Sequence, residues 1–106
     1  MSVGIDIVDT KRISLEEKFI KRILSIKEIE LLSSRFDKIG FLSGRWAAKE
    51  AFLKSLRTNI KGIDLRTIEV LNDKNGSPFI IYNNKKYENI SISHEKEFAI
   101  AIAIID

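Results

Sequence analysis

The stretch GRWAAKEAFLKSL, residues 44–56, constrains the fold more than any other part of the sequence. At about 100° per residue, a helix of this sequence carries bulky apolar side chains on one sector and small side chains on a nearly opposite one. A helix that is apolar on more than one side must be packed on more than one side. We therefore predict a central helix from about residue 37 or 39 to residue 56, with its charged residues held between packed surfaces.

Shorter elements are predicted before this helix. The run VGIDIV, residues 3–8, is apolar except for Asp6 and is typical of a short buried strand. Helix-start signals then occur at Ser14, which precedes two acidic residues, and at Ser25, where Glu28 completes the spacing of a capping box. We expect two short helices, one after each serine.

β-rich runs separated by turn signals follow the central helix. Two further strands are expected within residues 89–105. A strand, then helices, then a meander of strands predicts an α+β fold with antiparallel sheet, in a single domain spanning residues 1–106. Asn59 and Gly62 should end the central helix. The turns between the strands are expected at Asn75-Gly76 and at Asn83 to Lys86.

The terminal run FAIAIAII, residues 98–105, alternates large and small apolar residues. A strand that is apolar on both faces is expected to be buried on both. Its small-residue face indicates close packing against the central helix or another subunit. For a domain of this size, we expect burial of both faces to involve oligomerisation.

Composition limits the class of protein. The chain is 44% hydrophobic and 31% charged, as soluble globular proteins are, and no segment approaches the roughly 18–20 unbroken apolar residues of a membrane span. Asp6 and Asp9 stand where a signal peptide would be basic and then apolar, and the absence of cysteine fits a reducing compartment. We expect a cytoplasmic protein that does not bind membranes. Its net charge of +3 permits an acidic partner.

Two carboxylates lie in elements that should be buried. Asp6 interrupts an apolar strand, where aspartate is depleted and costly, and Glu50 lies on the central helix. Glu50 could simply pair with Lys54, four residues on. Alternatively, the two carboxylates hold Mg²⁺, which takes one or two protein carboxylates and completes its shell with water and phosphate oxygens. The sequence does not show that Asp6 and Glu50 meet. The basic residues that favour a phosphate beside such an ion are Arg45, Lys49 and Lys54.

His94 is the only histidine and stands at the expected end of a strand, after Ser91 and Ser93. A lone histidine is either structural, exposed or, in a chain that binds phosphates, a phosphate ligand. The sequence contains no P-loop, dinucleotide-binding fingerprint, metalloprotease helix or nucleophile triad.

Four motifs, in this order along the chain, resemble those of the holo-acyl-carrier-protein synthases, the small 4′-phosphopantetheinyl transferases. They are GIDIVDTKRI, FLSGRWAAKEAFLKSL, IEVLNDKNGSPFI and SISHEKEFAIAIAII. Members of this family transfer the phosphopantetheine arm of coenzyme A to a serine of apo acyl carrier protein and release adenosine 3′,5′-bisphosphate, a step of fatty acid biosynthesis. The resemblance covers essentially the whole chain. It implies a magnesium-dependent transferase that forms a homotrimer with active sites between subunits.

The resemblance also implies roles for individual residues. Asp6 and Glu50 would bind the metal. Lys54 or Lys49 would support the developing negative charge, with Lys54 taken as catalytic, and the serine proton would leave through Glu50 or a metal-bound water. The central helix departs from the family in carrying Trp46 where a phenylalanine is usual. The implied coenzyme A ligands are Arg45, Lys49, Lys54, Asn75, Gly76, Pro78 and His94, and the implied carrier-protein contacts, on the first helix, are Arg12, Lys18, Phe19 and Arg22.

Two functions of other classes compete with this one. A small basic nucleic-acid-binding module would need clustered basic residues and exposed aromatic residues on the sheet. The only aromatic candidates are Phe79, Tyr82 and Tyr87, and the basic residues are scattered. A non-catalytic oligomeric scaffold would not need Asp6 inside a strand.

Overall fold

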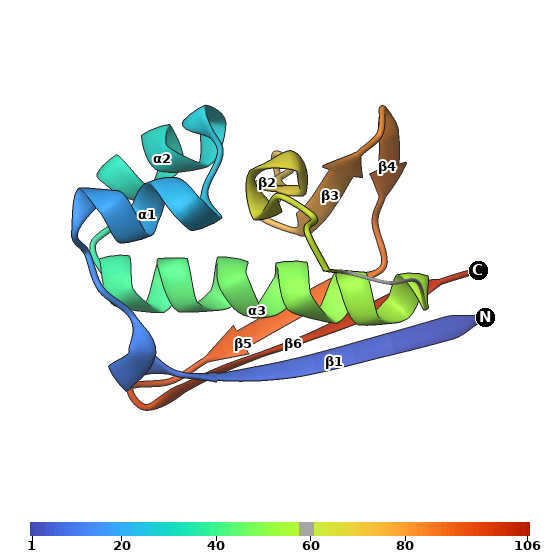
Figure 1. Ribbon diagram of the computed structural model, residues 1–106, viewed down its shortest axis with the longest axis horizontal. Helices are drawn as coiled ribbons and strands as arrows, with labels where there is room; N and C mark the ends of the chain where they lie inside the picture. Colours follow the sequence, from blue (N-terminus) through green and yellow to red (C-terminus); the bar gives the residue numbers. More distant parts are fainter. Residues whose placement is uncertain (58–60) are drawn as a thin grey trace.

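The computed structural model describes residues 1–57 and 61–106. It confirms an α+β architecture with an N-terminal strand, three α-helices and antiparallel sheets (Figure 1). The elements are β1 (Ser2–Asp9), η1 (Thr10–Arg12), α1 (Glu17–Ile23), α2 (Ile26–Ser33), α3 (Lys38–Leu56), η2 (Leu65–Thr67), β2 (Glu69–Asn72), β3 (Pro78–Tyr82), β4 (Lys85–Tyr87), β5 (Ile90–His94) and β6 (Phe98–Ile105).

The described strands form two three-stranded sheets, with the orders β1-β6-β5 and β2-β3-β4. The expected meander is therefore divided, because the β5–β6 hairpin returns to pair with the N-terminal strand. β6 pairs with β1 along its whole length, from Ser2 opposite Ile105 to Asp9 opposite Phe98. Helix α3 lies between this sheet and a second layer made of α1, α2 and the β2-β3-β4 sheet (Figure 1).

The small-residue face of α3 packs closely on the β1-β6-β5 sheet, as the sequence predicts. Ala47, Ala48 and Ala51 are completely buried there. At Gly4 of β1 the approach is so close that a Cβ atom would lie 1.8 Å from the Ala51 carbonyl oxygen. Only glycine fits at this position, because the atom it would meet belongs to helix backbone.

The opposite face of α3 is buried under the second layer. Phe52 is completely buried, and its ring makes edge contacts with Tyr82 at 5.6 Å and Tyr87 at 4.8 Å between centroids. Tyr82 and Tyr87 thus contribute to the core. A nucleic-acid-binding module would need these two aromatic residues exposed on its sheet, whereas here they pack against α3.

Only one stripe of α3 stays open. Between Gly40 and Ser55 every residue of the helix is buried except Trp46, Glu50 and Lys54, which are spaced four apart. Residues four apart lie on one face of a helix. The helix is therefore packed on most of its circumference and has a single accessible edge.

The outer face of the β1-β6-β5 sheet is apolar and exposed within the chain. Among the described residues, α3 covers one face of this sheet and no element covers the other. Burial of both faces of the last strand, which we expect to involve oligomerisation, is therefore not reached within one chain. The exposed residues are Val3 at 52%, Ile5 at 54%, Ile7 at 57%, Phe98 at 47% and Ile100 at 40%.

The two short helices differ in how they begin. The structure confirms the second: Ser25 accepts a hydrogen bond from the Glu28 amide, and the Glu28 side chain accepts one from the Ser25 amide. The first helix is also present, but it begins at Glu17, three residues after Ser14, and Ser14 is not its N-cap. Its N-cap is Glu16, which makes no side-chain cap, because the Ser14 hydroxyl instead accepts the Glu16 amide in a local turn.

Left-handed backbone occurs at asparagine or glycine in the turns between strands, and at an arginine at the end of α3. Asn83 and Asn84, with φ of 50° and 63°, join β3 to β4, and Gly76, with φ of 86°, lies in the β2–β3 turn. Helix α3 ends at Arg57, which takes a left-handed conformation itself, with φ of 55°. Asn59, the expected terminator, lies outside the described residues. No helix of the described chain is both long and apolar enough to cross a membrane.

Candidate functional site

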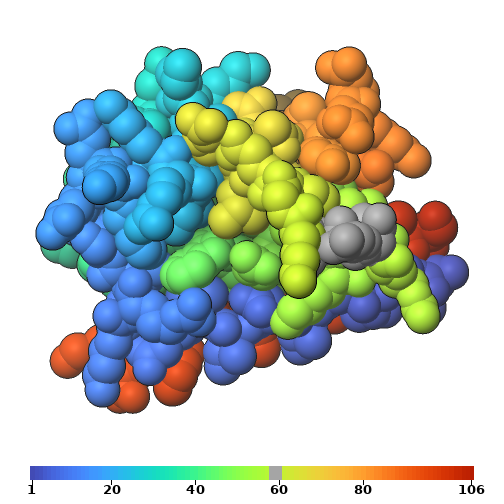
Figure 2. Space-filling model, in the orientation of Figure 1, coloured from blue at the N-terminus to red at the C-terminus, as the bar shows by residue number. Residues whose placement is uncertain are grey.

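The open stripe of α3 faces β1 along a seam. Asp6 points from β1 toward the helix, and its Oδ1 lies 2.9 Å from the Lys54 Nζ. Lys54 also donates to the Ile5 carbonyl at 3.0 Å. Glu50 lies about one helical turn, roughly 6 Å along the axis, before Lys54 on the same stripe. The seam is on the face seen in Figure 2, where α3 (green) is visible between β1 and the layer above it.

Lys54 pairs across the seam and not along the helix. The intrahelical pair between Glu50 and Lys54, the structural alternative for Glu50, is not formed, and Glu50 has no ion-pair partner among the described residues. Glu50 is half-buried and, within the described chain, without a cation, on the same stripe as Lys54, which pairs with the second carboxylate, that of Asp6. A carboxylate in this situation is suited to binding a positive ion.

The donors at the seam fit a hard ion with an open shell. The described residues contain no group of three or more histidine, cysteine or acidic side chains that could enclose a metal. An ion at the seam would therefore be held by Asp6 and Glu50 alone. That number suits Mg²⁺, which keeps most of its shell for water and phosphate oxygens.

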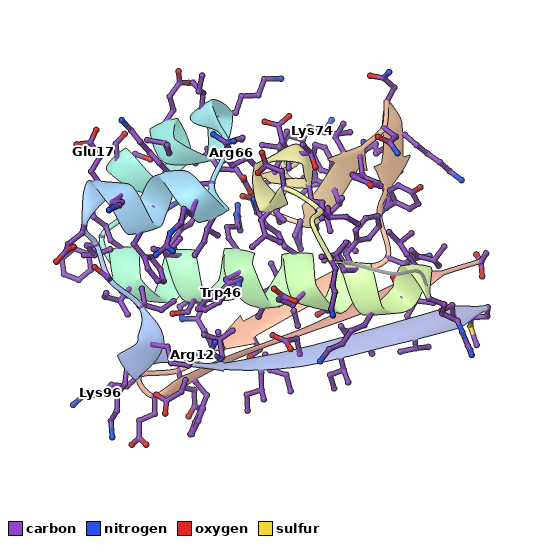
Figure 3. The ribbon with its side chains drawn as sticks, viewed as in Figure 1. Arg12, Glu17, Trp46, Arg66, Lys74 and Lys96 are labelled. Atoms are coloured by element: carbon purple, nitrogen blue, oxygen red, sulfur yellow. The ribbon has the colours of Figure 1, made fainter. Side chains whose placement is uncertain are left out.

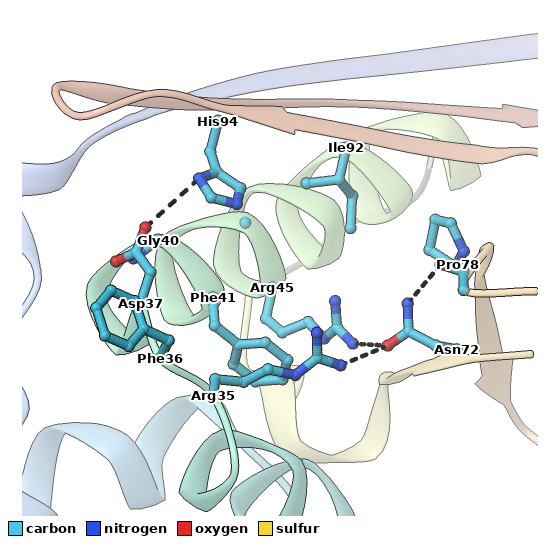
Figure 4. A pocket seen from close by; sticks show the side chains of 12 residues that line it. Arg35, Phe36, Asp37, Gly40, Phe41, Arg45, Asn72, Pro78, Ile92 and His94 are labelled. Carbon is cyan, nitrogen blue, oxygen red and sulfur yellow. Dashed lines mark hydrogen bonds and ion pairs between the residues drawn. The ribbon is translucent and has the colours of Figure 1, made fainter.

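A pocket of about 340 Å³ opens on the other side of α3, between the helix, β5 and the β2–β3 turn (Figure 4). Among the residues that line it are Arg45, Gly76, Pro78 and His94, all of which the sequence analysis named as coenzyme A ligands. Asn75, named with them, does not line this pocket.

Arg45 gives the pocket a desolvated positive charge. It is only 6% exposed, its guanidinium stacks 4.2 Å from the centroid of the Phe41 ring, and it donates to the Asn72 Oδ1. Its Nε has no hydrogen-bond partner. Burial lowers the pKa of Arg45 to about 10, with Glu28 opposing the shift and Arg35 adding to it. The residue remains cationic at neutral pH, and an anion in the pocket would compensate its lost hydration.

His94 faces this pocket beside the N-terminus of α3. Its Nδ1 lies 3.9 Å from the Oδ2 of Asp37, whose Oδ1 accepts the Gly40 amide and caps the helix (Figure 4). A Cβ atom at Gly40 would lie 2.4 Å from the Asp37 carboxylate and 2.8 Å from the imidazole. The glycine thus leaves room for the histidine and aspartate to lie against the helix.

The position of Lys49 differs from the one predicted from the sequence. It is completely buried, and its ammonium group donates to the Glu28 Oε1 at 2.6 Å and to the carbonyls of Ile23 and Leu65. These three acceptors use all of its N–H donors. Burial lowers the pKa of Lys49, and Glu28 opposes the shift. The predictions that Lys49 binds coenzyme A or supports charge in the reaction are wrong, because the side chain is enclosed in the core.

Glu28 is the partner that sequence reasoning missed. It also accepts the amides of Ser25 and Val70, so it joins the start of α2 to α3 and β2. Its capping-box spacing was the visible signal, but that spacing accounts for only one of these contacts.

Three of the four residues predicted to contact a carrier protein gather around Trp46, beside the seam. Arg12 lies 4.7 Å over the Trp46 ring (Figure 3). The Phe19 ring meets Trp46 edge-on at 5.8 Å, and Arg22 lies 5.8 Å over Phe19. Lys18 is exposed on α1. Arg12 belongs to η1 and not to the first α-helix, which is a second correction.

The seam and the pocket lie on opposite sides of α3. Around the helix axis, the stripe that carries Glu50 and the side that carries Phe41 and Arg45 are about 150° apart. In the sheet, Asp6 is on β1 and His94 is on β5, with β6 between them. One chain therefore does not bring its two sets of predicted ligands together.

The chain is similar to known proteins over almost its whole length. Residues 2–103 match the model of the 4′-phosphopantetheinyl transferase superfamily. The chain is 41% identical to a holo-(acyl-carrier-protein) synthase of Geobacillus sp., over 100% of this chain and 96% of the relative. It is 46% identical to the protein of that name from Mycoplasma capricolum, over 97% and 92%.

Solved structures with the same name have the same fold. The holo-(acyl-carrier-protein) synthase of Bacillus anthracis, in complex with CoA (3′,5′-ADP), has a TM-score of 0.83 at 39% identity and covers 95% of this chain and 91% of its own. That of Helicobacter pylori, in complex with coenzyme A, has a TM-score of 0.84 at 31% identity and covers 98% and 99%.

Proposed function

This chain belongs to the 4′-phosphopantetheinyl transferase superfamily, and on that premise we propose that it is a holo-acyl-carrier-protein synthase. It transfers 4′-phosphopantetheine from coenzyme A to a serine of apo acyl carrier protein, in the cytoplasm and for fatty acid biosynthesis. The observation that carries the proposal is a cationic pocket lined by Arg45 and His94 in a chain that matches these enzymes over its whole length.

The reaction is a displacement at phosphorus. The serine oxygen bonds to the β-phosphorus of coenzyme A, the bond from that phosphorus to the bridging oxygen breaks, and adenosine 3′,5′-bisphosphate leaves with the bridging oxygen. Asp6 and Glu50 would hold Mg²⁺, which would neutralise pyrophosphate charge as a Lewis acid. Lys54 stabilises the charge that develops on the phosphates. We assign the serine proton to Glu50, which passes it to solvent.

We propose a homotrimer whose active sites lie between subunits. Coenzyme A would reach from the pocket of one chain to the seam of its neighbour, since the two lie on opposite sides of α3. The exposed apolar face of β1 and β6 supports this arrangement, because contiguous apolar surface on that scale marks protein–protein contact.

The transfer itself can be tested by mass spectrometry. Incubation with coenzyme A, Mg²⁺ and apo acyl carrier protein is expected to add the phosphopantetheine mass to the carrier. Omission of Mg²⁺, with chelator present, should prevent the addition. An unmodified carrier in the complete mixture, together with tight oligonucleotide binding, would support the nucleic-acid module instead.

The basic group beside Trp46 predicts salt-sensitive docking of the carrier. Acyl carrier proteins are acidic. Arg12, Phe19 and Arg22 lie together around Trp46, and Lys18 is exposed on α1, so attraction should speed encounter. We expect kcat/KM for the carrier to fall at least about tenfold as ionic strength is raised well above physiological. Arg22→Ala should flatten the salt dependence, whereas Lys27→Ala on the exposed side of α2 should not. A profile independent of salt in the unaltered enzyme would remove electrostatic docking.

A further inference from the structure

Two arginines share one aromatic ring and one amide oxygen in the pocket. Arg35, in the loop between α2 and α3, lies 4.8 Å from the centroid of the Phe41 ring, and Arg45 lies 4.2 Å from it. Each directs an Nη2 to the Oδ1 of Asn72, at 3.4 Å for Arg35 (Figure 4). Neither Arg35 nor Asn72 is predicted from the sequence to bind a ligand.

No carboxylate of the described residues is in contact with this pair of cations, and Glu28, which opposes the pKa shift of Arg45, acts only from a distance because it is paired with Lys49. Neither guanidinium forms an ion pair within the described part of the chain, and the Nε of Arg45 is buried without an acceptor. Asn72 supplies only a neutral oxygen. Two like charges held together, one of them desolvated, cost free energy that a bound anion would recover.

The arrangement is held in place before any ligand arrives. The Nδ2 of Asn72 donates to the Gly76 carbonyl at 3.0 Å, which turns its Oδ1 toward the arginines. The Lys38 Nζ donates to the Arg35 carbonyl at 2.9 Å and fastens the loop to α3. Arg35 itself is exposed, so its side chain is not needed to fill the core.

The charge of this site selects among the phosphates of coenzyme A. A terminal phosphomonoester carries about −1.5 to −2 at pH 7, whereas each phosphate of a diester pyrophosphate carries a single negative charge. Guanidinium groups bind such oxygens with paired, charge-assisted hydrogen bonds. We propose that Arg35, together with Arg45, binds the 3′-phosphate of coenzyme A and makes Arg35 a determinant of specificity for coenzyme A over dephospho-coenzyme A. This proposal rests on the proposed function.

The test compares two substrates. Arg35→Ala should raise KM for coenzyme A about tenfold, the loss of one charge-assisted contact, and leave kcat for coenzyme A unchanged. With dephospho-coenzyme A, neither constant should change. Lys74→Ala removes an equal charge from the exposed β2–β3 turn without touching the pocket, and should leave both substrates unaffected. An equal rise in KM for both substrates in Arg35→Ala would overturn the proposal. Arg35 would then act on the pyrophosphate or through the overall positive potential of the pocket.

A binding measurement separates this inference from the activity. In calorimetric titration, the unaltered protein should bind adenosine 3′,5′-bisphosphate more tightly than 5′-AMP, and Arg35→Ala should lose most of that difference. A preference that survives the substitution would overturn the proposal even in an active enzyme. Absence of transfer in the unaltered enzyme, with the ligand preference intact, would instead refute the proposed function.

Discussion

Replacing Glu50 by glutamine is expected to reduce phosphopantetheine transfer at least about 10³-fold, within the range for loss of a catalytic proton acceptor. Glutamine keeps the size of the side chain, but it loses the negative charge that would hold Mg²⁺ with Asp6 and the basicity that would accept the serine proton. Glu50 lies on the open stripe and has no ion-pair partner among the described residues, so the fold should not depend on its charge. The measurement is the initial rate of carrier modification over a range of Mg²⁺ concentrations.

A matched control makes this result specific. Glu30→Gln removes the same charge from an exposed position on α2, and its rate should equal that of the unaltered enzyme. Size-exclusion chromatography should give the same oligomer for both variants. If Glu50→Gln retained full activity at ordinary Mg²⁺ concentration, the assignment of the metal and of the proton acceptor to Glu50 would be wrong.

Replacing Lys49 by methionine is expected to lower the free energy of unfolding by about 3–5 kcal/mol, the usual cost of breaking a buried ion pair. Methionine has nearly the same length, but it leaves the Glu28 carboxylate buried without a cation and the carbonyls of Ile23 and Leu65 without a donor. Urea denaturation at one fixed protein concentration measures the loss, since the stability of the proposed trimer would depend on concentration.

Two further variants separate stability from binding. Adding Glu28→Gln to Lys49→Met should restore part of the stability, because the uncompensated charge is removed. Lys54→Met breaks an ion pair whose lysine side chain is 50% exposed, and should cost less than about 1 kcal/mol while it impairs transfer. A stable Lys49→Met protein with a raised KM for coenzyme A would return Lys49 to the role that the sequence analysis gave it.

These two lysines show how far sequence reasoning could go. Both follow apolar residues on the same predicted helix, and both were assigned to phosphate. Their environments differ because Glu28, which lies 21 residues before Lys49 in the chain, folds over Lys49, whereas Asp6 meets Lys54 at an open seam. Helical periodicity places a side chain on a sector of its own helix, but it contains no information about which other element covers that sector.

The pocket shows the same limit. Arg45 and His94 are predicted from the sequence as ligands, and the structure brings them to one pocket. Arg35 and Asn72 line the same pocket but are not predicted from the sequence. Asn72 lies 27 residues from Arg45, and only the pairing of β2 with β3 and the packing of β2 near α3 bring them within hydrogen-bond distance. The residue types alone do not predict that Asn72 and Arg45 are in contact.

The sequence by itself determined the elements that depend on neighbouring residues: the multiply packed helix α3, the Ser25 capping box, the hairpin turns, and a carboxylate in an apolar strand that required an explanation. These follow from propensity, periodicity and local hydrogen bonding, which act over a few residues. The tertiary structure alone decided which charges are buried, how the strands divide into two sheets, and that the seam and the pocket lie on opposite sides of one helix. Those outcomes depend on contacts between residues far apart in the chain, since burial and pairing are properties of the assembled layers.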